Sequence, residues 1–334
     1  MDGITRVGRS SRLGKGMLAA AVFALVAPTA AIAAGTLDQE QASFGSSKAL
    51  IGTEETGQDV RQGQTFTAGA SGSLDQVDLP IRATGDPGVP LLVEIRAIGG
   101  DGYPSTVLSS TSVPQSSVPV CTAVGCDDDS PSGDFGTFSF VTISLSTPVV
   151  VSAGSQYAIV LSATGASYDI RGDMIDRTTN RYEWAGVSYE FGYAAGKGVG
   201  FRTDLGWIDS NADRAFRTYV TPPVATVQSP INADGSSVFK AKGIVPVRFA
   251  LSLNGVATCT LPAATIAVMR TGGTDPVPVN EDAYAGPADS GSAFRITGCQ
   301  YTYNLNAKAL GVGTYLVEIR IGSKTVGTAA FELH

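Results

Sequence analysis

The stretch from Arg181 to Trp207 combines aromatic rings with carboxylate and amide side chains. Its rings are Tyr182, Trp184, Tyr189, Phe191, Tyr193, Phe201 and Trp207, which include both tryptophans of the chain. An exposed ring on a β-sheet can stack against the apolar face of a sugar, while nearby polar groups bond the sugar hydroxyls. On this chemistry the candidate ligand-binding residues are Tyr182, Trp184, Tyr189, Trp207, Asp204, Asp209 and Asn211.

The alternative for each ring is a place in the hydrophobic core, where large aromatic side chains usually lie. Polar or glycine neighbours flank Tyr182, Trp184 and Trp207 in the sequence. We therefore expect these three rings to be the exposed ones.

A second group of candidate residues is acidic and follows the second cysteine. Calcium is bound by about six to eight oxygen atoms, and the high calcium concentration outside cells fills even weak sites. The candidate calcium ligands are Asp127, Asp129 and Asp134. Pro131 stands at the third ligand position of the usual loop pattern, and consecutive acids cannot all face one ion. A solvated acidic loop is therefore the favoured interpretation, with calcium as the alternative and no other cofactor expected.

Catalytic chemistry has few candidate residues. The only histidine is His334, which removes serine–histidine and cysteine–histidine catalysis and histidine-based zinc sites. Glu183 and Glu190 lie in the aromatic stretch, and a glycan hydrolase needs two carboxylates about 5–10 Å apart. Nothing in the sequence makes them face each other, so we expect no catalytic residues and no enzyme. A carboxylate-dependent glycan hydrolase or lyase is a less favoured hypothesis than a protein without catalytic activity.

The first 34 residues have the three parts of a secretory signal peptide. A basic segment precedes an apolar run from Met17 to Ala27, and Ala31-Ile32-Ala33 fits the small-x-small cleavage pattern. The run is shorter than the roughly 20 residues that span a bilayer, and no later segment is long enough. We expect a secreted protein, extracellular or associated with the cell surface, with no membrane span in the mature chain.

Four cysteines in an exported chain indicate disulfides. Proximity in the sequence favours the pairs Cys121–Cys126 and Cys259–Cys299. The first pair would close a small loop before the acidic residues, and the second would close a much larger one.

The chain is acidic, with 23 Lys and Arg against 30 Asp and Glu. Without residues 1–34, which hold four basic residues and Asp2, 19 basic and 29 acidic residues remain, a net charge of −10. An acidic surface repels phosphate backbones, which argues against a nucleic-acid partner.

The elements that must position these residues are strands. Apolar and polar residues alternate in many short segments, such as 77–82, 91–97 and 245–251, and turn signals separate them. This pattern predicts an all-β protein, with a β-sandwich over 35–220 and an immunoglobulin-like β-sandwich over 229–334. The adjacent prolines after Thr221 mark a Pro-rich linker at 221–228.

The C-terminal block resembles PxKF domains, a family of small immunoglobulin-like domains in exported bacterial proteins. The matching stretches are SPINADGSSVFKAKGIVPVRFALS (229–252), AFRITGCQYTYNLNAKAL (293–310) and GVGTYLVEIRIG (311–322). The segment Pro246-Val247-Arg248-Phe249 carries Arg where the family usually has Lys. The resemblance implies an accessory extracellular module that is not catalytic.

The N-terminal block is more loosely similar to the jelly-roll domains of secreted bacterial proteins, including those of the choice-of-anchor type. The matching stretches are GQTFTAGASGSLDQVDLPI (63–81), LLVEIRAIGGDGYPSTVLSS (91–110), PVVVSAGSQYAIVLSA (148–163) and DRAFRTYV (213–220). This resemblance implies a jelly roll in an extracellular setting.

Together these observations predict a secreted, non-catalytic binding protein, with a polysaccharide or another cell-envelope component as its partner. The alternative is a structural surface or adhesion protein that recognises other proteins.

Overall fold

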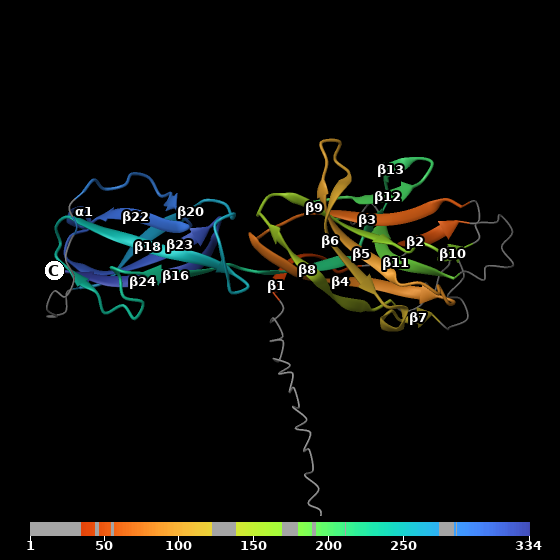
Figure 1. Cartoon of the computed structure of the whole chain (residues 1–334), viewed down its shortest axis with the longest axis horizontal. Coiled ribbons are helices and arrows are strands. Elements are labelled where there is room, and N and C mark those ends of the chain that lie inside the picture. Colours follow the sequence, from red (N-terminus) through yellow and green to blue (C-terminus); the bar gives the residue numbers. More distant parts are fainter. Residues whose placement is uncertain are drawn as a thin grey trace, which may run out of the picture. The chain divides into compact units, whose positions relative to one another are not determined.

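The computed structural model describes residues 35–43, 47–54, 57–121, 138–168, 180–188, 192–210, 212–273, 284 and 286–334. These residues form an all-β protein, as predicted (Figure 1). Their helical elements are a 3-10 turn, η1 (Gln115–Ser117), and one short helix, α1 (Ala307–Leu310). No helix among them is long and apolar enough to cross a membrane. The predicted signal peptide, residues 1–34, lies outside the described residues.

The first fifteen strands belong to one sheet. They are β1 (Thr36–Gln41), β2 (Ser47–Glu54), β3 (Asp59–Thr67), β4 (Gly72–Thr84), β5 (Leu91–Ile98), β6 (Pro104–Val113), β7 (Val120–Cys121), β8 (Phe140–Val151), β9 (Gln156–Ser162), β10 (Ser167–Tyr168), β11 (Arg181–Ser188), β12 (Gly198–Arg202), β13 (Gly206–Asp209), β14 (Ala212–Arg214) and β15 (Phe216–Thr221). The main path through the sheet runs β1-β15-β4-β11-β2-β3-β9-β5-β6.

This sheet curls around its own core. The long strand β4 pairs with β8 along residues 72–80 and with β11 along residues 81–84. The strand at the end of the path, β6, returns beside β8, where Ser146 N donates to Thr111 Oγ1 at 2.9 Å. Side chains that alternate along the strands fill the enclosed space, and Val77, Leu79 and Ile81 have no exposed surface. The predicted period-two pattern is therefore the inward face of β4.

The remaining nine strands form two further sheets, which enclose a second core. They are β16 (Val224–Gln228), β17 (Val238–Phe239), β18 (Ile244–Leu253), β19 (Val256–Thr258), β20 (Ala264–Gly272), β21 (Arg295–Thr297), β22 (Gln300–Asn306), β23 (Gly313–Ile321) and β24 (Lys324–Leu333). One sheet has the order β16-β18-β22-β21 with β19 beside β18, and the other has the order β17-β24-β23-β20. Val245, Val247 and Phe249 of β18 point into the core, as their alternation predicts.

The predicted linker at 221–228 is only partly correct. Pro222 and Pro223 do separate β15 from β16. Residues Val224–Gln228, however, pair with β18 as an ordinary antiparallel strand. Their side chains alternate between exposed Val224 and buried Ala225, so the strand pattern resumes directly after the two prolines.

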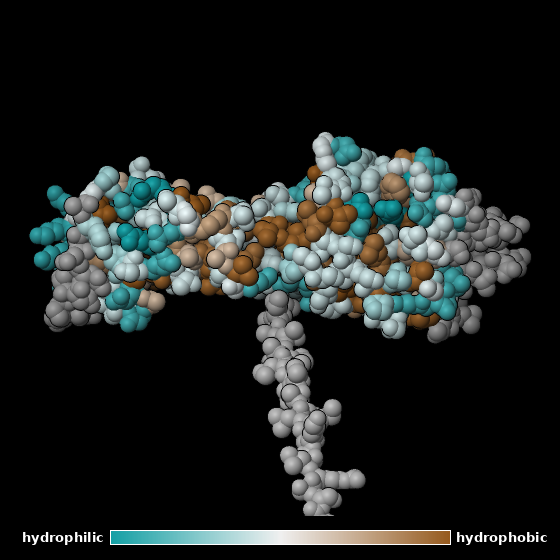
Figure 2. All heavy atoms as spheres, viewed as in Figure 1, coloured by the Kyte–Doolittle hydropathy of each residue, from teal (hydrophilic) through white to brown (hydrophobic). Residues whose placement is uncertain are grey.

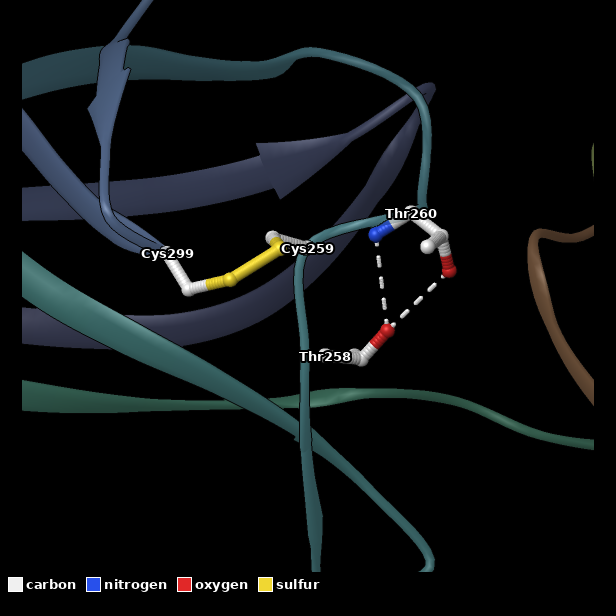
Figure 3. Close-up of a disulfide and its surroundings, with 4 residues drawn as sticks. All are labelled: Thr258, Cys259, Thr260 and Cys299. Atoms are coloured by element: carbon white, nitrogen blue, oxygen red, sulfur yellow. Dashed lines mark hydrogen bonds between the residues drawn. A yellow bond between two sulfur atoms is a disulfide. The ribbon is translucent and has the colours of Figure 1, made fainter.

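One predicted disulfide is present in the second group of strands (Figure 3). Cys259 follows β19 and Cys299 lies in the turn between β21 and β22, with their Cα atoms 5.2 Å apart. The pairing Cys259–Cys299 is therefore confirmed. Cys121 ends β7, whereas Cys126 lies outside the described residues, so the pairing Cys121–Cys126 stays a prediction.

Replacing Cys259 and Cys299 together by serine should destabilise this part of the protein by about 4 kcal/mol, because the disulfide closes a loop of 40 residues. Guanidinium unfolding of the double variant and the oxidised wild type measures the difference. Adding a reductant should bring the wild type towards the variant without changing the variant itself. An unchanged unfolding midpoint in the variant would contradict the stabilising role of this disulfide.

Candidate functional site

The expectation that Tyr182 and Trp184 are exposed is wrong. Both are fully buried in the core of the first sheet. The Tyr182 hydroxyl donates to the carbonyl of Val89 at 2.6 Å, and Trp184 Nε1 donates to the carbonyl of Ala215 at 2.8 Å. Their polar atoms are thus satisfied inside the protein, and neither ring is available to a ligand.

The polar neighbours of these rings suggested exposure because they occupy the opposite face of β11, but that face is buried as well. Glu183 has no exposed surface and bonds three cations: Arg82 at 2.6 Å, Arg181 at 2.9 Å and Lys48 at 3.2 Å. The ring of Phe138 covers Arg82, whose guanidinium carbon lies 4.2 Å from the ring centroid. We call Lys48, Arg82, Arg181 and Glu183 the Glu183 cluster.

The Glu183 cluster explains the charge state of its carboxylate. Burial by itself would raise the pKa of Glu183, but the positive charges of Lys48, Arg181 and Arg82 outweigh burial and lower the pKa below its usual range. A buried, ionised and triply paired carboxylate is poorly suited to donate or accept a proton at a substrate. The other carboxylate considered for glycan hydrolysis, Glu190, lies outside the described residues.

The candidates Trp207, Asp204 and Asp209 do come together, on the hairpin formed by β12 and β13. Trp207 stands opposite Phe201, with the ring centroids 5.3 Å apart. On the other side of β12, β3 places Arg61 opposite Phe201, and the Arg61 guanidinium carbon lies 5.0 Å from the Phe201 centroid. Directly opposed residues share one face of a sheet. Arg61, Phe201 and Trp207 therefore form a continuous row.

Asp209 belongs to the same face, because it lies two residues beyond Trp207 on β13. We call Arg61, Phe201, Trp207 and Asp209 the hairpin face. Trp207 is half-buried, whereas Asp209 is exposed. Ile208, between them, points to the opposite side of the hairpin and is 45% exposed.

The acidic side chains of this region are held by cations. Asp204 lies at the hairpin turn and is bonded by Arg202 at 2.6 Å, which lowers the pKa of its carboxyl. Asp209 accepts from Lys197 Nζ at 2.5 Å, and this bond lowers the pKa of Asp209. Lys197 Nζ also lies 4.5 Å from the ring centroid of Tyr103, on the turn between β5 and β6.

A polar cleft of about 310 Å³ opens beside Lys197. Its lining residues are Thr65, Thr67, Gly102, Gln156, Ala194, Ala195, Gly196 and Lys197. We call it the Lys197 cleft. It gathers β3, the start of β9, a hairpin turn and the segment before β12, which are far apart in the sequence. No local motif marks these residues, so sequence reasoning missed them.

The backbone on either side of the cleft segment is held by Asp213, which lies on β14. Asp213 accepts the backbone N–H groups of Tyr193 at 2.6 Å and Gly198 at 2.7 Å. Asp213 therefore fixes both ends of the segment from Tyr193 to Gly198.

The remaining candidates fall on residues that the structure does not describe. They are the ligand-binding candidates Tyr189 and Asn211 and the calcium candidates Asp127, Asp129 and Asp134. Within the described ranges, no three acidic, histidine or cysteine residues gather in a way that could hold a metal ion.

No known protein family matches the chain, and a search of curated proteins finds no match either.

Replacing Glu183 by glutamine should destabilise the protein by about 3–5 kcal/mol, because three buried cations lose their shared counter-charge. The matched control is Glu318→Gln, since Glu318 also pairs with an arginine two residues away but at a partly exposed site, and should cost at most about 1 kcal/mol. Chemical unfolding at neutral pH measures both. Equal losses in the two variants would contradict the importance of the Glu183 cluster.

Stability should fall as the pH rises from about 10 towards about 12. Burial raises the pKa of Tyr182 and of Tyr193 to about 12, so the unfolded chain releases these protons first and gains stability relative to the folded one. Burial lowers the pKa of Arg214 to about 10, which acts in the opposite direction.

The variant Tyr182→Phe isolates one of these contributions. Its loss of stability between about pH 9 and about pH 11 should be smaller than that of the wild type, as measured by urea unfolding at both pH values. Tyr284→Phe removes an exposed hydroxyl and serves as the control that keeps the wild-type dependence. The same pH dependence in Tyr182→Phe as in the wild type would show that the buried hydroxyl plays no part.

Proposed function

We propose that this protein is secreted and binds carbohydrate or another cell-envelope polymer without catalysis, through the hairpin face. The proposal rests on the ring pair of Trp207 and Phe201 on the outer surface of the sheet. Trp207 is half-buried there. A half-buried ring is held in place by its neighbours and still offers a flat apolar surface, which is the requirement for stacking on a sugar.

The surroundings of the ring pair suit the polar part of a sugar. Arg61 on one side and Asp209 on the other supply a donor and an acceptor on the same face as Trp207. Asp204 and Arg202 add an exposed ion pair at the end of the hairpin. Hydroxyl groups are recognised by such paired donors and acceptors beside an aromatic ring.

The setting of this site also supports a role outside the cell. Residues 1–34 have the pattern of a signal peptide, and Cys259–Cys299 is a disulfide, which persists in oxidising surroundings. The resemblance of residues 229–334 to PxKF domains implies an accessory extracellular module, and the looser jelly-roll resemblance of residues 35–220 agrees with that setting. The chain is acidic, which disfavours nucleic acid as the partner.

A second candidate function, a structural or adhesion protein that recognises other proteins, is favoured by one observation. Leu205 and Ile208 of the same hairpin are 56% and 45% exposed. Figure 2 shows apolar atoms among hydrophilic ones in the region of β12 and β13. Exposed apolar residues on a protruding hairpin are also suited to a protein partner.

The variant Trp207→Ala should reduce retention on immobilised polysaccharide at least about fivefold, because an aromatic anchor that the ligand covers commonly contributes more than 1 kcal/mol to binding. Retention of the purified protein on a panel of plant, fungal and bacterial cell-wall glycans measures the effect. Ile208→Ala, on the same strand but the opposite face, is the control that should bind as the wild type does.

Unaltered retention of Trp207→Ala, or no retention of the wild type on any glycan of the panel, would contradict the proposal. Loss of retention in Ile208→Ala alone would place glycan binding on the opposite side of the hairpin and would also contradict the proposal. Both variants are to be compared by circular dichroism first, so that a folding defect is not taken for a binding defect.

A further inference from the structure

We propose that the Lys197 cleft binds one ring of an uncharged glycan and that another ring further along the same glycan chain stacks on Trp207. This proposal rests on the function proposed for the adjoining hairpin face. The cleft thus selects the class of polymer, whereas the hairpin face supplies the aromatic contact.

The cleft has a rigid wall. The segment before β12 is bonded to β3 at three points: Thr65 N donates to the Lys197 carbonyl at 2.9 Å, Lys197 N donates to Thr65 Oγ1 at 2.8 Å, and Thr67 Oγ1 donates to the Ala195 carbonyl at 2.8 Å. A Cβ atom on Gly196 would lie 1.9 Å from the Thr65 carbonyl oxygen, so only glycine permits this close approach. A preformed wall lowers the entropy cost of binding.

The lining has the chemistry that recognises hydroxyl groups. Gln156 opposes Thr67 in the pairing of β3 with β9, so the two side chains share a face, and Gln156 is exposed. Its amide offers both donors and an acceptor, as sugar hydroxyls require. The volume of about 310 Å³ lies at the lower end of the range for small-molecule sites, which suits a single sugar ring better than a large ligand.

The electrostatics of the cleft favour a neutral glycan over an acidic one. Among the residues described as lining it, Lys197 is the one with a charge, and Asp209 already neutralises that charge at 2.5 Å. The chain as a whole carries a net charge of −7. A carboxylated glycan would therefore meet no unpaired cation in the cleft and would be repelled by the protein as a whole.

The cleft and the hairpin face are joined through Asp209. This residue bonds Lys197 at the edge of the cleft and lies two residues from Trp207 on the same face of β13, a spacing of about 7 Å along a strand. Lys197 and Phe201, which opposes Trp207, are four residues apart, about 13 Å along the strand. One extended glycan chain can therefore contact both sites, with at least one further ring between the ring in the cleft and the ring on Trp207.

The experiment compares retention on neutral glucans, mannans and xylans with retention on polygalacturonate and hyaluronan, for the full-length protein and three variants. Gln156→Ala should weaken retention on the neutral glycan about fivefold, through the loss of the amide hydrogen bonds. Gln300→Ala removes an exposed glutamine of a different sheet and should leave retention unchanged. Trp207→Ala reports on the hairpin face itself.

The outcomes separate the two proposals. Weaker binding to a neutral glycan by both Gln156→Ala and Trp207→Ala, with wild-type binding by Gln300→Ala, supports the inference. Weaker binding by Trp207→Ala alone overturns the role of the cleft and leaves the function of the hairpin face in place. Stronger wild-type retention on the anionic glycans overturns the selectivity. No retention on any glycan overturns the proposed function, and the inference with it.

Discussion

The Glu183 cluster is the interaction on which the first sheet depends. A carboxylate without water is costly unless it is paired and hydrogen-bonded, and Glu183 is paired with cations from β2 and β4 as well as from its own strand. These contacts hold Glu183 opposite Arg82 and Leu50, which places Trp184 opposite Ile81. A slip of one residue would turn Glu183 into the core and Trp184 out of it. The ion pairs therefore specify the register that buries Tyr182 and Trp184.

That register determines which aromatic residues of the stretch remain accessible to a ligand. With Tyr182 and Trp184 inside, the aromatic stretch offers Trp207 and Phe201 on the β12–β13 hairpin as its outer surface among the described residues. The hairpin is attached to the core through β3, whose Phe66 is buried in the core while Arg61 and Thr65 face the hairpin side. Asp213 fixes the segment that leads into β12. β3 thus faces the core on one side and the candidate site on the other.

The second group of strands reaches its stability in a different way. Its core holds stacked and edge-on aromatic rings, such as Phe249 with Tyr301 at 4.6 Å and with Phe294 at 4.7 Å. Its charged pairs, such as Arg320 with Glu318, lie at the surface, and the disulfide joins two turns. Aromatic packing and the disulfide therefore stabilise this part of the protein, where the first sheet relies on a buried ion cluster.

The sequence by itself determined the all-β class and the inward residues of strands such as β4 and β18, because alternation is a local property. It favoured the pairing of Cys259 with Cys299, which the structure then confirmed. It also placed Trp207, Asp204 and Asp209 in one region. Only the tertiary structure decided that the polar face of β11 is buried, since Glu183 meets an arginine 101 residues away. The Lys197 cleft likewise exists only where four distant segments meet. Alternation shows which side chains share a face, but the strands that cover that face are chosen by contacts far apart in the chain.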